Sequence, residues 1–449
     1  MGSKSSVYRL AVILCTWLLS SPLCAQESPA TPVPGQVPAV EVEVVPSALR
    51  VNGFGTLGMV RSGTNFEGVY RRDVSQSSSR GATSATTDSR VGIQANYALN
   101  AQFELVGQLV AKERALSNRP RDALEWAFLS YRPTADTTLR VGRTSPDLFL
   151  LSDYRNVGFA YVAARPPVDF YGVLPLGPLD GVDVTKSWIS SDVAWRAKAF
   201  WGRNYDPFQR PSDVARKADL RGVYGLVLSG EYEGFLGRAT LARSRVDFKS
   251  VQSQLQPLND GLDALTGLPV PTVAAEAQSL QSRLKFSDIF ATYTALGVAY
   301  DRASWLVNAE ALRTQSNAPS VELQAGYVML GRRLGKWTVH GTLSAVRTVG
   351  SAPAAPQWAG SLSSLASVLG PNFASNAQFL GSAAVAAINS GRSQQSTVSL
   401  GARWDFDPRI ALKLQWDRVR VAPNGGFIMS GKSSGGVINA GTVLFDFVF

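Results

Sequence analysis

Residue types that carry catalysis are scarce in this chain of 449 residues. A hydrolytic site needs a nucleophile, a base and a group that orients the base. His340 is the only histidine, and no motif surrounds it. Both cysteines, Cys15 and Cys24, fall in an N-terminal segment that we expect to be removed. No His, Cys, Asp and Glu residues show metal-ligand spacing. The sequence predicts a protein that is not an enzyme and has no metal or cofactor, although a site made of carboxylates alone stays open.

Other charged residues point to electrostatic chemistry, and they lie in an apolar stretch from Ser145 to Asp180. A connection this apolar is expected to pack against protein. We expect it to fold into the interior of a barrel, where its charges would act on passing solutes as a channel constriction does. The alternative is that it covers the outside of the fold or a neighbouring subunit. Its charged residues are Asp147, Asp153, Arg155, Arg165 and Asp169.

The C-terminal strand indicates the kind of fold that would hold such a loop. Val443, Phe445, Phe447 and Phe449 alternate with more polar residues, so the segment has one strongly apolar face. An exposed apolar edge strand invites aggregation, whereas a closed barrel in lipid covers the face and pairs the edge. The alternative is the last buried strand of a soluble sandwich.

Strand-like stretches recur along the rest of the chain, with little helical periodicity between them. Their alternation predicts sixteen strands. The predicted ranges are 49–61, 88–98, 102–113, 124–133, 138–144, 181–190, 193–203, 221–232, 236–248, 290–301, 304–313, 321–333, 337–348, 394–406, 409–421 and 436–449.

The connections between these stretches alternate between short and long. The short turns 190–192 and 335–336, for example, alternate along the chain with long loops such as 145–180, 204–220 and 349–393. Outer-membrane barrels show this asymmetry, with tight periplasmic turns and long external loops. The predicted fold is therefore an all-β transmembrane antiparallel β-barrel of 16 strands with both termini on the periplasmic side, and its third loop is predicted to lie in the lumen.

The N-terminus indicates export. Lys4 and Arg9 precede an apolar run from Leu10 to Leu19, which is typical of a signal peptide and too short to span a membrane. We predict a signal peptide over 1–25, a Pro-rich periplasmic segment over 26–48 and the barrel over 49–449. The formal net charge is +10, but the basic residues are scattered, so nucleic acid is the least expected partner.

Two long loops contain stretches rich in Ala and Ser that favour short helices. These stretches are Trp358–Leu369 and Phe373–Ile388 in one loop and Val273–Leu284 in the other. We expect these helices over or inside the mouth of the barrel, where long loops are often functional.

The chain resembles the general porin superfamily of Gram-negative outer membranes. The resemblance rests on Val51–Gly58, on Leu139–Arg143 and on the terminal Phe449, and the stretch from Ser152 through Tyr171 is similar to a porin-like branch of proteobacteria. It implies a homotrimer, a third loop folded inward, and recognition of Phe449 by the barrel-assembly machinery.

The resemblance also implies loop carboxylates that face basic side chains on the wall. Asp147, Asp153 and Asp169 would be the loop carboxylates, while Arg155 and Arg165 depart from the acidic pattern and favour a mild anion preference. The wall residues expected from alternation are Arg90, Arg140, Arg196, Lys198, Arg238 and Lys413.

The predicted function is passive diffusion of small hydrophilic solutes and ions across the outer membrane. The first alternative is a porin selective for phosphate, organic acids or sugars, and the second is an outer-membrane enzyme or adhesin. The expected partners are outer-membrane lipid and lipopolysaccharide, further copies of the chain and the barrel-assembly machinery.

Overall fold

The structure is a computed structural model, and it describes residues 48–63, 70–76, 83–114, 120–174, 177–208, 216–318, 321–429 and 435–449. The predicted signal peptide, 1–25, lies outside these residues, as does the Pro-rich segment 26–48 except for its last residue.

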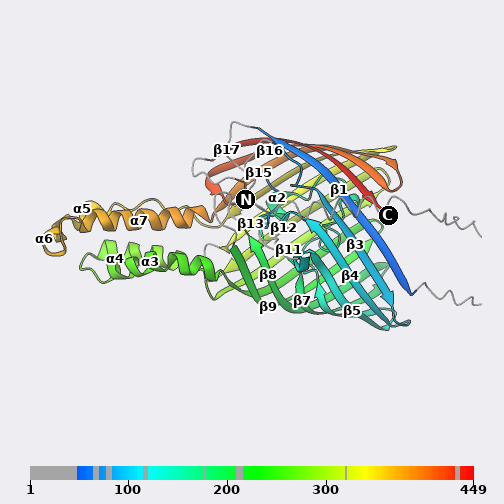
Figure 1. Cartoon of the computed structure of the whole chain (residues 1–449), viewed down its shortest axis with the longest axis horizontal. Helices are drawn as coiled ribbons and strands as arrows, with labels where there is room; N and C mark the ends of the chain where they lie inside the picture. Colours follow the sequence, from blue (N-terminus) through cyan, green and yellow to red (C-terminus); the bar gives the residue numbers. More distant parts are fainter. Residues whose placement is uncertain are drawn as a thin grey trace, which may run out of the picture.

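One antiparallel sheet closes on itself to form the barrel (Figure 1). Each strand pairs with its neighbour in the chain, and β17 pairs back with β1, which confirms the predicted sixteen strands. The short strand β2 (Thr83–Ser84) is a further piece that pairs with β1. The barrel strands are β1 (Leu49–Ser62), β3 (Arg90–Ala98), β4 (Phe103–Lys112), β5 (Leu124–Thr134), β6 (Thr137–Thr144), β7 (Leu179–Ser190), β8 (Val193–Phe208), β9 (Arg216–Tyr232), β10 (Phe235–Asp247), β11 (Ile289–Arg302), β12 (Trp305–Ser316), β13 (Leu323–Leu334), β14 (Trp337–Thr348), β15 (Ser393–Asp407), β16 (Ile410–Gly426) and β17 (Gly436–Val448).

The strands place polar residues on the inner face and apolar residues on the outer face. On β16, Lys413 and Asp417 are buried, whereas Leu414 and Trp416 are exposed. A period of two along each strand produces this separation around the whole barrel. The outer surface is therefore apolar, as a barrel embedded in lipid requires.

The C-terminal residue closes the barrel against β1. The Gly53 N–H donates to the Phe449 carbonyl oxygen at 2.7 Å, and the Phe449 N–H donates to the Gly53 carbonyl oxygen at 2.9 Å. A Cβ on Gly53 would overlap the Phe449 ring, so glycine leaves the space that this ring fills.

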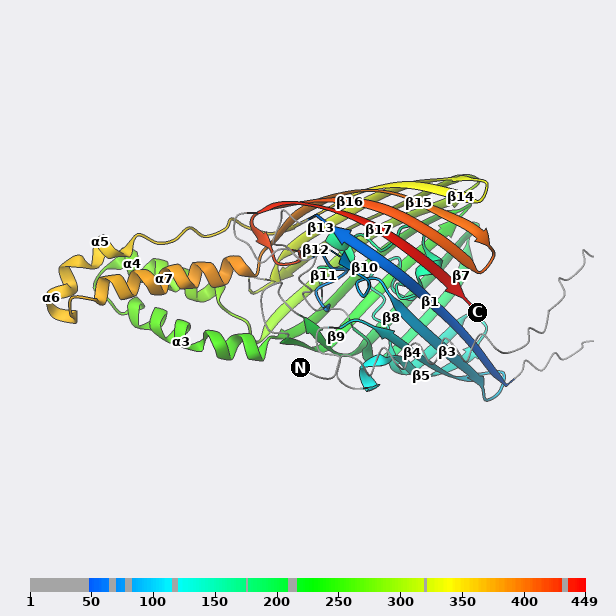
Figure 2. The same ribbon diagram turned by 45° about the horizontal axis from the view of Figure 1, so that its top comes forward.

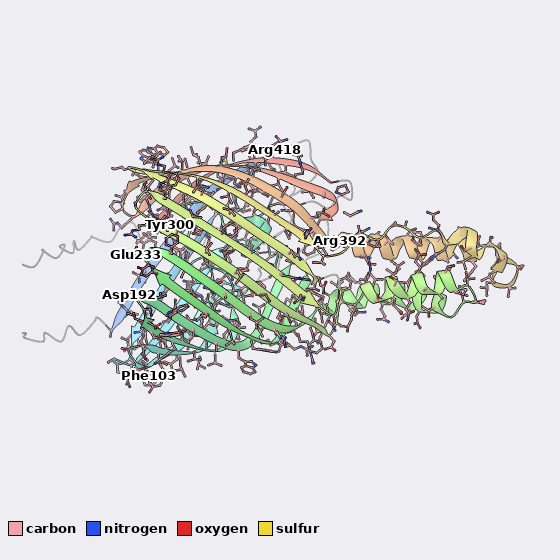
Figure 3. All side chains as sticks on the ribbon, turned by 180° about the vertical axis from the view of Figure 1, so that it is seen from behind. Phe103, Asp192, Glu233, Tyr300, Arg392 and Arg418 are labelled. Atoms are coloured by element: carbon pink, nitrogen blue, oxygen red, sulfur yellow. The ribbon has the colours of Figure 1, made fainter. Side chains whose placement is uncertain are left out.

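The short turns lie at the same end of the barrel as the C-terminus (Figure 3, where Asp192 and Glu233 mark the turns). Ser191 and Asp192, between β7 and β8, have φ of 50° and 64°. Two successive left-handed residues form the tight turn that suits the twist of a hairpin. The long loops leave from the opposite end, which agrees with the predicted alternation.

Two of the long loops form a helical projection that extends away from the barrel (Figures 1 and 2). Trp358 Nε1 donates to a Glu276 carboxylate oxygen at 2.7 Å and so joins the two loops. The projection consists of α3 (Lys249–Thr266) and α4 (Pro271–Arg283) from one loop, and α5 (Trp358–Leu362), α6 (Ala366–Leu369) and α7 (Phe373–Ser390) from the other.

Helices form in the stretches where the sequence predicted them, but their location relative to the barrel was predicted wrongly. The helices do not lie over or inside the mouth, because the two loops bury apolar side chains against each other, among them Leu262, Leu280 and Val385. Helix α3 was not predicted, since Pro257 and Gly261 interrupt its sequence. No helix among the described residues has the length and apolar character needed to cross a membrane.

Candidate functional site

The connection between β6 and β7 binds the inner face of the barrel at many points, and we name its described residues, 145–174 and 177–178, the inner segment. It contains the 3-10 helix η2 (Gly158–Ala160) and the short helix α2 (Val168–Tyr171). Phe149, Phe170 and Arg165 are each at most 2% exposed. Side chains of ten strands form hydrogen bonds with this segment, namely β3, β4, β8, β10, β11, β12, β14, β15, β16 and β17.

Lys413 on β16 binds the backbone of the inner segment. Its Nζ donates to the carbonyl oxygens of Gly158 at 2.7 Å, Tyr161 at 2.5 Å and Ala163 at 3.1 Å, and it pairs with Asp446 at 2.9 Å. A Cβ on Gly158 would overlap Asp446 Oδ1 and a second wall oxygen. The segment therefore approaches the wall here as closely as only glycine permits.

Two arginines extend this backbone contact. Arg90 on β3 donates to the Asn156 carbonyl oxygen at 2.6 Å and to the Tyr161 hydroxyl at 2.5 Å. Arg403 on β15 donates to the Phe159 carbonyl oxygen at 2.7 Å. Two predicted wall residues, Arg90 and Lys413, thus bind backbone or hydroxyl oxygens of the segment and none of its predicted carboxylates.

Arg165 reverses the expected charge arrangement, because here the inner segment supplies the cation and the wall supplies the anions. Its guanidinium pairs with Asp88 at 2.5 Å and with Asp417 at 2.8 Å. It also donates to the hydroxyls of Tyr70 at 2.5 Å and Thr442 at 2.8 Å. The guanidinium is therefore fully satisfied and unavailable to a passing solute.

Asp147 is the predicted loop carboxylate that lies beside two of the predicted wall residues. Arg238 on β10 binds it at 2.5 Å, and Lys198 on β8 binds it at 3.3 Å. Burial opposes the ionisation of Asp147, but the two cations outweigh burial and hold the pKa of this carboxyl below its usual value. A loop carboxylate thus faces two of the predicted basic wall residues.

Asp169 is fully buried on α2, and its hydrogen bonds come from uncharged groups. Ser344 Oγ donates to it at 2.7 Å and Gln395 Nε2 at 2.5 Å. Burial raises the pKa of Asp169 above its usual value, although both hydrogen bonds oppose that rise. This carboxyl attaches the inner segment to β14 and β15 and has no cation within ion-pair distance among the described residues.

Asp153 and Arg155 are only half-buried. One Asp153 carboxylate oxygen is buried without a hydrogen-bond partner among the described residues, and the Arg155 guanidinium has none there either. Arg140 on β6 pairs with Asp183 at 2.9 Å and lies over the Phe128 ring, and Asp153 is close enough to affect it electrostatically.

Arg196 is exposed on β8 near the turn to β7 and contacts none of the predicted site residues. Within the described ranges, no group of three or more His, Cys, Asp and Glu residues has the geometry to hold a metal ion.

Several functional residues were missed because the prediction took only basic residues for the wall. The acidic residues that bind the inner segment or pair with basic residues of the wall lie mostly on the same polar strand faces as those basic residues. Alternation would have found those on strands, since Asp417 and Asp446 have the same orientation as Lys413. The missed residues are Asp88, Asp183, Glu310, Asp417 and Asp446.

No protein-family model matches the chain, and no curated protein sequence matches it. Among solved structures, the outer membrane channel DcaP of Acinetobacter baumannii is 11% identical, with 89% of this chain and 97% of that chain covered and a TM-score of 0.50. An anion-selective porin from Comamonas acidovorans is 11% identical, with 89% and 99% covered and a TM-score of 0.49. At these identities the likeness concerns the fold, which is a closed β-barrel like that of the Acinetobacter channel.

Proposed function

We propose that this protein is an outer-membrane channel for passive diffusion of small hydrophilic solutes and ions, and that the inner segment lies in the lumen and narrows it. The observation that carries the proposal is the set of hydrogen bonds between the inner segment and ten strands around the barrel. A segment outside the barrel would meet the apolar outer face instead. A polar inner wall with a narrow passage is what a diffusion channel requires.

The charges that act on solutes would be those left free by these contacts. Asp147, Arg165 and Asp169 are engaged in attaching the segment and Arg140 pairs with Asp183, so Asp153 and Arg155 are the remaining site candidates. The formal net charge of +10 becomes +8 when Lys4 and Arg9 are removed with residues 1–25 (10 − 2 = 8), and this basic excess favours a mild anion preference.

Planar-bilayer recording tests this function. We expect stepwise openings of the purified protein and a reversal potential in a salt gradient that shows chloride to be more permeant than potassium. Arg155→Gln should lower the chloride preference and Asp153→Asn should raise it, because each removes a free charge from the passage. Arg196→Gln, away from the segment, is the matched control and should change little.

Three outcomes would contradict parts of this proposal. A folded protein that never opens would favour an enzyme or a structural role. Block of the current by one solute at low concentration would favour a substrate-selective porin. Potassium more permeant than chloride would overturn the anion preference and leave the channel intact.

The orientation and export of the chain follow as part of the same proposal. Residues 1–25 are a signal peptide, residues 26–48 a periplasmic segment, and the long loops face the cell exterior of a Gram-negative bacterium. Phe449 serves as the assembly signal, supported by its place at the barrel seam against Gly53. Because both ends of the barrel chain lie with the short turns, the periplasmic side carries the termini.

We propose a homotrimer as the assembled state. This proposal rests on the resemblance of Val51–Gly58, Leu139–Arg143 and Phe449 to the general porins, which are trimers. The expected result is a band at three times the monomer mass on an unheated denaturing gel and one monomer band after boiling. A monomer mass in detergent by light scattering would contradict this state.

A further inference from the structure

A pocket of about 410 Å³ lies in the helical projection, between α4 and the segment 349–357 that leads from β14 to α5. Two contacts join its walls. Arg283 Nη1 donates to the Ser351 carbonyl oxygen at 3.4 Å, and Trp358 Nε1 donates to a Glu276 carboxylate oxygen at 2.7 Å. The apolar part of the lining includes Val273, Leu280, Pro353, Pro356 and Trp358.

Opposite charges stand at the two ends of this pocket. Glu276 and Arg283 both line it and are seven residues apart on α4. Seven residues are close to two helical turns, so the two side chains share one face and their α-carbons are about 10 Å apart along the axis. Among the described residues, Glu276 pairs with no cation and Arg283 pairs with no carboxylate. Both charges are therefore available to a ligand.

Arg392 adds a second positive charge at the base of the projection (Figure 3, where it is labelled). Its Nη2 donates to the Gly350 carbonyl oxygen at 2.5 Å, next to the Ser351 that Arg283 contacts. Burial, and to a smaller extent the neighbouring Arg283, lower the pKa of the Arg392 guanidinium. No carboxylate of the described chain pairs with Arg392. The Arg283 end of the pocket thus carries an excess of positive charge.

We propose that this pocket binds a short zwitterionic peptide, with its ammonium group at Glu276, its carboxylate at Arg283 and small side chains against the apolar lining. An extended peptide spans about 3.3–3.6 Å per residue, so three residues match the separation of the two charges. A carboxylate accepts paired, charge-assisted hydrogen bonds from a guanidinium. Trp358 binds one Glu276 oxygen and leaves the other for an ammonium donor.

The two charges also decide against other ligands. A simple anion would leave Glu276 without a partner, and a simple cation would leave Arg283 without one, whereas a dipolar ligand satisfies both ends. The site lies outside the barrel, on the loop side. The inference rests on the proposed function only in placing this pocket on the external side, where it would collect peptides near the channel mouth.

Isothermal titration calorimetry of the full-length protein in detergent tests the binding, with trialanine as the probe. We expect one site on the wild-type protein. Glu276→Gln and Arg283→Gln should each weaken binding about fivefold, as the loss of one exposed charge contact does. Asp260→Asn on α3 and Arg420→Gln on β16 remove the same charges outside the pocket, and both controls should bind as the wild type does.

Capped peptides assign each end of the pocket. N-acetyl-trialanine lacks the ammonium group and trialanine amide lacks the carboxylate. Glu276→Gln should therefore weaken binding of the amide and leave binding of the N-acetyl peptide unchanged, and Arg283→Gln should do the reverse. If both variants weaken both capped peptides equally, the assignment of the two ends is wrong. Dialanine that binds as tightly as trialanine would overturn the assigned length.

A third variant tests the pocket without removing a charge. Ser279 is exposed on α4 between Glu276 and Arg283 and lines the pocket, so Ser279→Trp should fill it and abolish binding. Gln278→Trp places the same side chain at an exposed position that does not line the pocket and should bind as the wild type does. No binding of trialanine to the wild type would overturn the proposal, and so would unchanged binding in the three pocket variants.

Bilayer conductance separates this inference from the channel function. The projection extends away from the barrel, so the three pocket variants should retain the wild-type conductance. Loss of peptide binding with normal conductance supports the pocket. A silent wild-type channel that binds trialanine, with weaker binding in Glu276→Gln, would refute the channel alone.

Discussion

Arg165→Met is expected to destabilise the folded barrel by about 3–5 kcal/mol, because it leaves two buried carboxylates without their cation. Asp88 and Asp417 are both almost fully buried, and the guanidinium is their shared partner. The measurement is the temperature at which the folded band disappears on a semi-native gel, together with urea unfolding of the purified protein. An unfolding midpoint equal to that of the wild type would show that the ion pairs of Arg165 with Asp88 and Asp417 contribute nothing to the stability of the barrel.

Two controls distinguish the loss of the buried ion pairs of Arg165 from the effect of removing any arginine charge. Arg143→Met breaks the exposed pair with Asp180 and should cost no more than about 1 kcal/mol. The triple variant Arg165→Met/Asp88→Asn/Asp417→Asn removes the uncompensated charges and should recover much of the loss. If the triple variant is no more stable than Arg165→Met, the effect comes from packing of the long side chain and not from charge.

The strands could be predicted because lipid on one side and water on the other impose a strict period of two. Residues of β16 such as Lys413, Leu414 and Trp416 show the pattern directly. The sequence also marks each short turn, since two or three polar or glycine residues interrupt the alternation. Strand order then follows from the chain, because in a barrel of this kind each strand pairs with the next.

The contacts of the inner segment could be predicted only in part. Asp147, Lys198 and Arg238 were each among the predicted site residues, but the sequence did not indicate that these three would pair. The partners of Arg165 were not predicted, because Asp417 lies 252 positions away, on a strand that the curvature of the barrel brings to it. The carbonyl acceptors of Lys413 carry no sequence signal, since every residue has one.

The direction of the helical projection was also beyond the sequence. Local composition predicts a helix over 373–388. Where the apolar face of this helix is buried depends on the other loop, which carries α3 and α4. Leu380 packs close to Gly261 on the other loop, and Trp358 reaches Glu276 there. Two loops far apart in the chain thus stabilise each other outside the barrel, which no pattern within either loop indicates.

Gly158→Leu is expected to displace the inner segment from the wall and to lower the mean conductance. The backbone at Gly158 lies against Asp446, Thr56 and Arg90, so a side chain there has to push the segment toward the lumen. The displacement would break the hydrogen bond from Lys413 Nζ to the Gly158 carbonyl oxygen, now 2.7 Å. Overpacking at a buried site costs about 1–3 kcal/mol. Single-channel recording should show a smaller and noisier current, and gel unfolding should show a lower midpoint.

Substitutions of graded size at two glycines make this result specific. Gly158→Ala should give a smaller change in the same direction, because even a Cβ overlaps Asp446 there. Gly441 is on the outer face of β17 with open space around it, so Gly441→Leu should leave conductance unchanged. A larger current in Gly158→Leu would mean that the displaced segment leaves the passage. In that case the native contact of the segment with β1 and β17 would be what narrows the lumen. An unchanged current would place the passage elsewhere and contradict the proposed constriction.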